Sequence, residues 1–222
     1  MGKCLFLRKG ETHTAPISGI LLSSLAEGSI VKLNENGSPV EFYVAKHDYE
    51  SGLNGTGRTL LVRKDCYGSG RWGSFTVAYS GCTMDTWFNS TYKTLFATEI
   101  QNLIGETKFY CTYATKDGDN SVVTISRAVF ALSLREIYGS HSHSNAEGTT
   151  LSIAGAIRAN GFDYHTRSPY VPYSGSYMNW RIASSGGIGS GAVNSDYSYR
   201  PCFTLPSNAL FDKNTLILKG VA

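Results

Sequence analysis

A tyrosine-rich stretch, residues 163–200, most constrains the fold of this chain. It holds six of the fourteen tyrosines, and most of its other residues are Ser, Gly, Asn and Asp. Tyrosine offers a large rigid contact surface with few rotatable angles, and the small polar residues add adaptable hydrogen-bonding groups, as in antibody combining surfaces. Apolar residues within the stretch anchor it, namely Trp180, Ile182, Ile188 and Val193. We therefore predict a displayed recognition surface and not a flexible linker; residues 163–200 are called the recognition segment below.

Side chains of the recognition segment are expected to contact a ligand, because aromatic anchors usually dominate binding interfaces and small polar groups surround them. The expected ligand-binding residues are Tyr170, Tyr173, Ser174, Ser176, Tyr177, Asn179, Trp180, Ser184, Ser185, Asn194, Asp196, Tyr197 and Tyr199. Trp180 is also expected to share in the core. Arg167 and Arg200 stand near the two ends of the segment and are predicted to be scaffold residues that tether backbone carbonyl groups, with anion binding as the alternative.

Composition narrows the class of protein. A chain of 222 residues with 41% hydrophobic residues is long enough to bury a core. The net charge of +3 is scattered, and without a Lys/Arg cluster it does not predict nucleic-acid binding. The chain has no run of about eighteen apolar residues, the length that a membrane-spanning helix needs, so membrane insertion is not expected. The beginning of the chain lacks the apolar core of a signal peptide, so we expect synthesis in a cytoplasm. The five widely spaced cysteines predict buried reduced thiols.

The remaining pattern predicts a mixed α+β domain. Two strands are expected around Asn36-Gly37, a dipeptide that tolerates positive φ at both turn positions. Residues 83–96 form the clearest helix, with Thr83 as a plausible N-cap and an apolar stripe at three- and four-residue spacing. The stripe consists of Met84, Trp87, Phe88, Thr91 and Leu95. Further strands are predicted at 58–64, 109–113, 121–134 and near the C-terminus, and short helices at 98–104 and 134–138. Residues 1–28 are expected to be a docking or assembly arm.

Several stretches resemble a known family: FLRKGETHTAPISG, LNENGSPVEFYVAKHD, LLVRKD, FALSL, TRSPY and YRPCFTLPSNALF. The chain resembles proteins of gut bacteria and their phages whose domain of unknown function is usually considered C-type-lectin-like. This resemblance implies a C-type-lectin-like α+β fold with long loops over residues 29–222, preceded by the short N-terminal arm 1–28. Some relatives resemble variable proteins of diversity-generating retroelements, which implies that the recognition segment is diversified in such systems.

Two better-known C-type-lectin patterns are missing from the sequence. Calcium needs six to eight oxygen ligands, and the recognition segment offers only the carboxylates of Asp163 and Asp196. Calcium-mediated sugar binding is therefore not expected. The formylglycine-generating enzymes of this fold use paired reactive cysteines, which the single Cys202 does not match.

Other candidate chemistry is weaker. His141-Ser142-His143 is the only metal-like spacing, but no third ligand is near in sequence, so a solvated loop is preferred to a metal site. A nucleophile needs a His base and an orienting acid, and no nucleophile-elbow sequence is present. His165 is expected to be a surface contact or scaffold residue. We predict no enzyme activity and no cofactor.

The sequence favours a ligand- or receptor-binding display protein, most simply a tail-associated phage virion protein assembled in the bacterial cytoplasm. Its expected partner is a host cell-surface protein or glycan, with other virion proteins docking through residues 1–28 and a homo-oligomer left open. A host-encoded bacterial display or lectin-like protein, in the cytoplasm or at the cell surface, is the alternative. A hydrolase ranks last.

Overall fold

A computed structural model describes residues 18–74, 78–113, 120–170 and 177–222. The helices are α1 (Ser51–Asn54), α2 (Thr83–Ser90), α3 (Thr98–Leu103), α4 (Leu134–Tyr138) and α5 (Ala154–Arg158), with short 3-10 turns η1 (Leu22–Ser24) and η2 (Tyr92–Leu95). The strands are β1 (Ile20–Leu21), β2 (Ile30–Glu35), β3 (Ser38–His47), β4 (Arg58–Arg63), β5 (Tyr67–Arg71), β6 (Thr107–Thr112), β7 (Val122–Arg127), β8 (Val129–Ala131), β9 (Tyr164–Tyr170), β10 (Met178–Ile182), β11 (Ile188–Ala192), β12 (Asp196–Tyr199), β13 (Pro201–Pro206), β14 (Ala209–Phe211) and β15 (Leu218–Val221).

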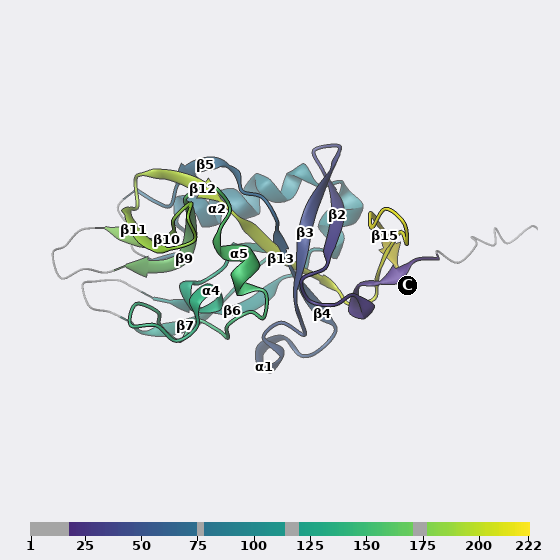
Figure 1. Cartoon of the computed structure of the whole chain (residues 1–222), viewed down its shortest axis with the longest axis horizontal. Helices are drawn as coiled ribbons and strands as arrows, with labels where there is room; N and C mark the ends of the chain where they lie inside the picture. The colour runs from purple at the N-terminus through teal and green to yellow at the C-terminus, as the bar shows by residue number, and fades with distance from the viewer. Residues whose placement is uncertain (1–17, 75–77, 114–119, 171–176) are drawn as a thin grey trace, which may run out of the picture.

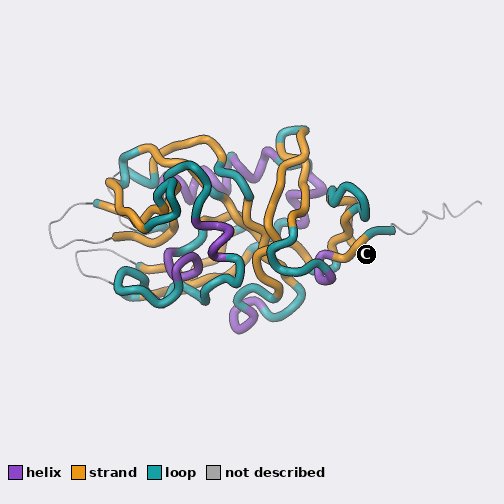
Figure 2. Tube along the Cα trace, in the orientation of Figure 1, coloured by secondary structure: helices purple, strands orange, loops and turns teal. Residues whose placement is uncertain are grey.

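Within the described residues, the strands form two five-stranded sheets and two smaller ones. A central sheet has the order β2-β3-β4-β13-β8, and a second sheet has the order β11-β10-β9-β12-β5. A three-stranded sheet β1-β14-β15 and the hairpin β6-β7 complete the set. Helices and strands are both present and most strand pairs are antiparallel, which confirms the predicted mixed α+β class (Figures 1 and 2). Among the described residues, the helices are too short and too polar for a membrane span.

The hairpin β2-β3 confirms the local prediction. Asn36 has φ 50° and Gly37 has φ 79°, the two positive values that a tight two-residue turn requires. Glu35 pairs with Ser38 directly across this turn. The register therefore follows from two residues whose backbone accepts the left-handed region.

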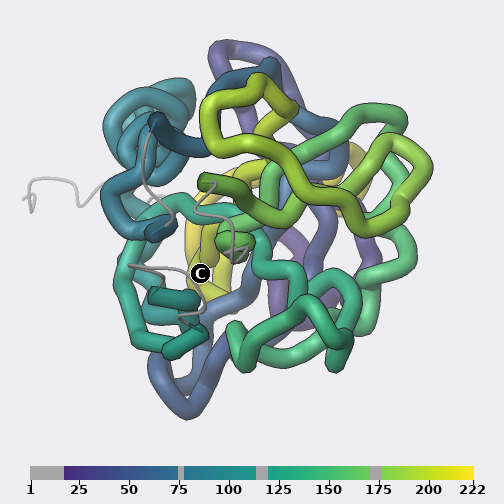
Figure 3. Tube along the Cα trace, turned by 90° about the vertical axis from the view of Figure 1, so that its left-hand side faces the viewer, coloured from purple at the N-terminus to yellow at the C-terminus, as the bar shows by residue number. Residues whose placement is uncertain are grey.

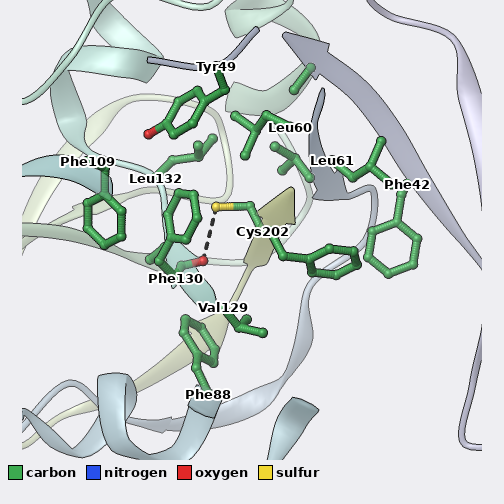
Figure 4. Close-up of a cluster of buried hydrophobic side chains, with 14 of the residues drawn as sticks. Phe42, Tyr49, Leu60, Leu61, Phe88, Phe109, Val129, Phe130, Leu132 and Cys202 are labelled. Atoms are coloured by element: carbon green, nitrogen blue, oxygen red, sulfur yellow. Dashed lines mark hydrogen bonds between the residues drawn. The ribbon is translucent and has the colours of Figure 1, made fainter. Parts of the chain in front are cut away.

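The core lies where β4 and β13 run through the middle of the central sheet. Phe42, Phe96 and Phe203 form an aromatic cluster with ring centroids 5.3–6.3 Å apart. Around Cys202 the side chains of several strands converge (Figure 4), and its Sγ donates to the carbonyl oxygen of Phe130 at 3.0 Å. Burial raises the pKa of the Cys202 thiol well above its usual value. Such a thiol is an inert part of the core.

The other described cysteines are also free thiols. Cys82 and Cys111 are buried, whereas Cys66 is half-buried. Burial raises the pKa of the Cys66 thiol to about 11 and that of Cys82 to about 12. Cys4 lies outside the described residues. The predicted reduced thiols are thus found at the described positions, with Cys66 less deeply placed than expected.

The predicted long helix is divided. The helix α2 ends at Ser90, and η2 follows as a 3-10 turn after Thr91, which has φ −116°. The N-cap is Cys82 and not Thr83: its Sγ accepts the N–H of Asp85 at 3.4 Å. The 3-10 turn also rotates the stripe, so that Tyr92 is buried while Thr91 is exposed.

The described part of the N-terminal arm packs on the domain. Leu22 is fully buried, the N–H of Ser23 donates to Ser207, and that of Gly28 donates to Val44. β1 pairs with β14, which also pairs with β15. β1 and β15 thus lie on either side of β14, which brings the two ends of the described chain near each other. Residues 1–17 lie outside the described residues.

This small sheet and the sheet that contains the recognition segment lie at opposite ends of the molecule. In Figure 1, β15 and the C-terminus are on the right, and β9, β10 and β11 are on the left. The two sheets are therefore separated along the long axis of the molecule.

Candidate functional site

The recognition segment folds mainly as strands. β9, β10, β11 and β12 all come from it, and only β5 of their sheet comes from elsewhere. Figure 3 looks onto this end of the molecule. The prediction for this domain included long loops. The described part of the segment consists mainly of regular strands, which differs from that prediction. The expected contact residues Tyr173, Ser174 and Ser176 lie outside the described residues.

Two close contacts explain how a Gly/Ser-rich sequence makes strands. A Cβ atom on Gly191 would lie 2.4 Å from the ring of Tyr197, and one on Gly189 would lie 3.0 Å from the guanidinium of Arg181. The tyrosine and arginine side chains therefore lie flat over glycines of β11. The guanidinium carbon of Arg181 is also 4.9 Å from the centre of the Tyr197 ring, a cation–π contact.

Arg167 and Arg200 bind backbone carbonyl groups at the two ends of the segment. Arg167 donates to the carbonyl oxygens of Tyr110, Ala131 and Glu147 at 2.8–3.0 Å. Arg200 donates to those of Arg63, Ile157 and Lys64. Both side chains are buried, so an external anion has no open path to them in this structure.

The guanidinium of Arg167 belongs to a buried polar network. It makes an ion pair of 2.6 Å with Glu136, whose other oxygen accepts the hydroxyl of Tyr49 at 2.5 Å. Glu147 accepts the N–H of Thr112 at 2.8 Å. Burial lowers the pKa of Arg167, but the charges of its acidic neighbours outweigh that effect and hold it well above its usual value. Burial raises the pKa of the Glu147 carboxyl.

This network is closed to solvent. Arg167, Glu136 and Glu147 are each 0% exposed. A substrate therefore cannot reach the carboxylates without opening the core, and the network acts as a scaffold under β9.

An aromatic stack lies on the surface of the recognition segment. The indole ring of Trp180 is 4.4 Å from the ring of Tyr170 and 4.7 Å from that of His143, measured between centroids. His143 is in turn 4.9 Å from His141, and both histidines are exposed. Trp180 and Tyr170 are half-buried, and Tyr177 is 47% exposed. The sequence suggested a solvated loop at His141 and His143, whereas the structure brings that loop onto Trp180.

Among the residues that the structure describes, no third side chain joins His141 and His143 to complete a metal site. Within residues 18–74, 78–113, 120–170 and 177–222, no three His, Cys, Asp or Glu side chains come together in a way that could hold a metal ion.

Four small polar residues of the expected contact set lie in or beside turns. Ser184 and Ser185 are exposed in the turn between β10 and β11, and Asn194 and Asp196 are exposed around the turn before β12. Ser184 is fixed there because its N–H donates to Asp163 Oδ1 at 2.7 Å. These four residues, together with Tyr170, Tyr177 and Trp180, form the accessible part of the expected contact set. Tyr197 is half-buried.

Two expected contact residues lie in the interior instead. Asn179 is 0% exposed and Tyr199 is 5% exposed. The Nδ2 of Asn179 donates to Nδ1 of His165 at 3.0 Å, and the hydroxyl of Tyr199 donates to the carbonyl oxygen of Arg71 at 2.7 Å. Both side chains therefore hold the sheet together, and the prediction that they contact a ligand directly is not supported by their burial.

His165 ties the segment to β5. Its Nε2 donates to the carbonyl oxygen of Gly70 at 3.0 Å, so Nδ1 is the nitrogen that accepts from Asn179. Burial lowers the pKa of His165 to about 4, which keeps the ring neutral. The expected alternatives were a surface contact and a scaffold residue, and the buried position is that of a scaffold residue.

Sequence reasoning missed the strand β5. Its residues line a pocket of about 400 Å³ together with the first turns of α2 and the end of β12. The lining residues are Tyr67, Gly68, Ser69, Gly70, Arg71, Thr83, Trp87, Asp196 and Tyr199. The sequence of β5, YGSGR, has the same Tyr, Gly and Ser composition as the recognition segment. This shared composition is the sequence signal that could have associated β5 with the recognition segment.

Comparison with known proteins assigns the chain to a family but does not indicate an activity. A family model described as "Domain of unknown function (DUF6273)" matches residues 56–207, which include β5 and the whole recognition segment. Searches of curated proteins and of solved structures gave no match. Because the matched range covers more than half of the chain, the protein belongs to the DUF6273 family.

Proposed function

We propose that this chain is a ligand-binding display protein that contacts its partner with the exposed side of the recognition segment. The aromatic stack of Tyr170, Trp180 and His143 carries the proposal. Partly exposed tryptophan and tyrosine rings on a rigid strand are typical of interface anchors, because little side-chain freedom is lost on binding. The exposed turn residues Ser184 and Asn194 provide hydrogen-bonding groups at the rim.

The partner is proposed to be a protein or glycan on a bacterial cell surface, and the display platform is proposed to be the tail of a phage virion. Both follow from the resemblance to proteins of gut bacteria and their phages. The position of the recognition segment supports such an arrangement, since it lies at the opposite end from the described part of the arm, 18–28 (Figure 1). A chain held by one end would present the other.

The C-type-lectin-like fold and the diversification of the segment are part of this proposal. The fold is supported by the mixed α+β class and by β1 and β15, which flank β14. Diversification is supported only by the residue types at the exposed turn positions. Sequencing of the DNA around the gene tests it: a template repeat beside a reverse transcriptase is expected, and their absence argues against it.

The binding surface is tested with fluorescently labelled protein on a panel of cultured gut bacteria, read by flow cytometry. Tyr177→Ala and Trp180→Ala are expected to remove binding to the strains that the native chain labels. Val221→Ala is the matched control, because Val221 is 39% exposed at the other end of the molecule. Equal labelling by all three variants would place the contact surface elsewhere. Mass spectrometry of purified phage particles tests the virion assignment independently.

A further inference from the structure

The pocket beside β5 has an aromatic floor. Trp87 and Tyr67 are half-buried, with ring centroids 5.5 Å apart, and Tyr199 lies behind Trp87 at 5.2 Å. At about 400 Å³ the pocket falls within the size range of small-molecule sites, which are mostly apolar with a few placed polar groups. The floor suits the apolar part of a small ligand.

Two opposite charges stand in the lining of the same pocket. Arg71 and Asp196 are direct partners in the register of β5 and β12, a position in which side chains are close neighbours. Both side chains are exposed. Although they are neighbours, they form no ion pair or hydrogen bond with each other or with any other residue in the described part of the chain. One guanidinium and one carboxylate therefore remain available to a ligand.

The backbone of β5 is open at Gly68, which also lines the pocket. Gly68 has φ +46°, and no atom lies within 4 Å of where its Cβ would be. A side chain at this position would be strained and would project into open space. Glycine thus permits a close approach to the strand.

We propose that this pocket binds a small zwitterion, a molecule that carries an ammonium group and an acidic group on an apolar body. Arg71 can bind a carboxylate or phosphate through two parallel N–H donors, and Asp196 can accept from or pair with the ammonium. Trp87 and Tyr67 contact the apolar body or a methylated ammonium, which aromatic faces attract. A pure anion would face Asp196, and a pure cation would face Arg71. A zwitterion satisfies both charges.

The experiment is isothermal titration calorimetry on the full chain. The probes are phosphocholine, in which the ammonium is methylated, and L-tryptophan, in which the apolar group is separate from the charges. Choline and methyl glucoside serve as the cationic and the neutral comparison. We expect at least one zwitterion to bind with a Kd of roughly 1 mM or lower, and more tightly than either comparison compound.

The variants separate the pocket from the rest of the surface. Arg71→Gln and Asp196→Asn are each expected to weaken binding by about tenfold or more. Thr83→Phe fills the rim from an exposed position on α2 and should remove binding while both charges remain. Lys213→Gln and Glu99→Gln change exposed charges outside the pocket and should leave the affinity unchanged. Circular dichroism confirms that each variant is folded.

Three results would overturn the proposal: no heat of binding from either zwitterion up to about 10 mM, equal affinity in the native chain and the pocket variants, or equally tight binding of choline or methyl glucoside. The pocket shares Asp196 with the exposed part of the recognition segment, but Tyr177 and Trp180 are not among its lining residues. Tyr177→Ala and Trp180→Ala should therefore retain zwitterion binding, so that failure of one proposal is distinguishable from failure of the other.

Discussion

The imidazole of His165 and the backbone of Gly70 are joined by a hydrogen bond of 3.0 Å that fastens the edge strand β5 to the recognition segment. The second ring nitrogen accepts from Asn179, so the folded chain uses the neutral form of the ring. Protonation would place an N–H against the amide donor. The bond therefore links the stability of this sheet to pH.

Stability is expected to fall between pH 6.5 and pH 4. The pKa of His165 is about 4 in the folded chain, where burial lowers it from its usual 6.5. The unfolded chain therefore takes up the proton first as the pH falls, and stability that is complete above pH 6.5 is lost towards pH 4. A shift of this size corresponds to roughly 3 kcal/mol. Urea unfolding at a series of pH values measures the slope. His165→Gln should flatten it, whereas the exposed His143→Gln should not; an unchanged slope in His165→Gln would contradict the assignment.

Arg167→Met is expected to destabilise the chain strongly. The substitution leaves the buried carboxylate of Glu136 without its ion-pair partner, and breaking a buried pair from one side typically costs about 3–5 kcal/mol. Chemical denaturation measures the loss. Lys64→Met is the control, because its ion pair with Glu41 is solvent-accessible and should contribute little. Similar effects from the two variants would show that the buried network does not hold the fold.

Gly70→Ala is expected to destabilise the sheet by about 1–3 kcal/mol through overpacking. A Cβ at this position would lie 2.4 Å from the hydroxyl of Tyr199, which is buried and cannot move freely. Thermal unfolding measures the change. Gly52→Ala in α1 is the matched control, since nothing lies within 4 Å of its Cβ position. A Gly70→Ala variant as stable as Gly52→Ala would mean that Tyr199 is not tightly held.

Removal of metal ions is expected to leave the melting temperature nearly unchanged. The recognition segment has only the carboxylates of Asp163 and Asp196, and Asp163 is engaged by Arg181 and Ser184. Scanning calorimetry with and without EDTA provides the measurement. A large drop on chelation, restored by added calcium or zinc, would reveal a bound ion that stabilises the folded chain.

Local signals predicted the elements whose structure depends on neighbours in sequence. The positive φ of Asn36 and Gly37 follows from their residue types, and α2 follows from its apolar spacing. The strand β11 was not predictable in this way, because Gly189 and Gly191 have low intrinsic preference for strands. They lie in a strand because Arg181 and Tyr197 cover them.

The division of the recognition segment into exposed and buried positions was also beyond the sequence. Asn179 and Trp180 are adjacent, yet Asn179 is fully buried and Trp180 is only half-buried. Successive residues of a strand face opposite sides of the sheet, and Asn179 lies on the side where it bonds His165 of the neighbouring strand. Composition identified the segment as a surface but did not distinguish its inner side chains from its outer ones.

The interior positions of Asn179 and Tyr199 limit which residues can be randomised in a library of binding variants based on this fold. Randomising every codon of residues 163–200 would fill the library with chains that have lost the bonds between β9 and β10 and between β12 and β5. A better library would keep Asn179, Tyr199 and Gly191 constant. It would vary Tyr177, Ser184, Ser185 and Asn194, whose side chains are exposed to solvent.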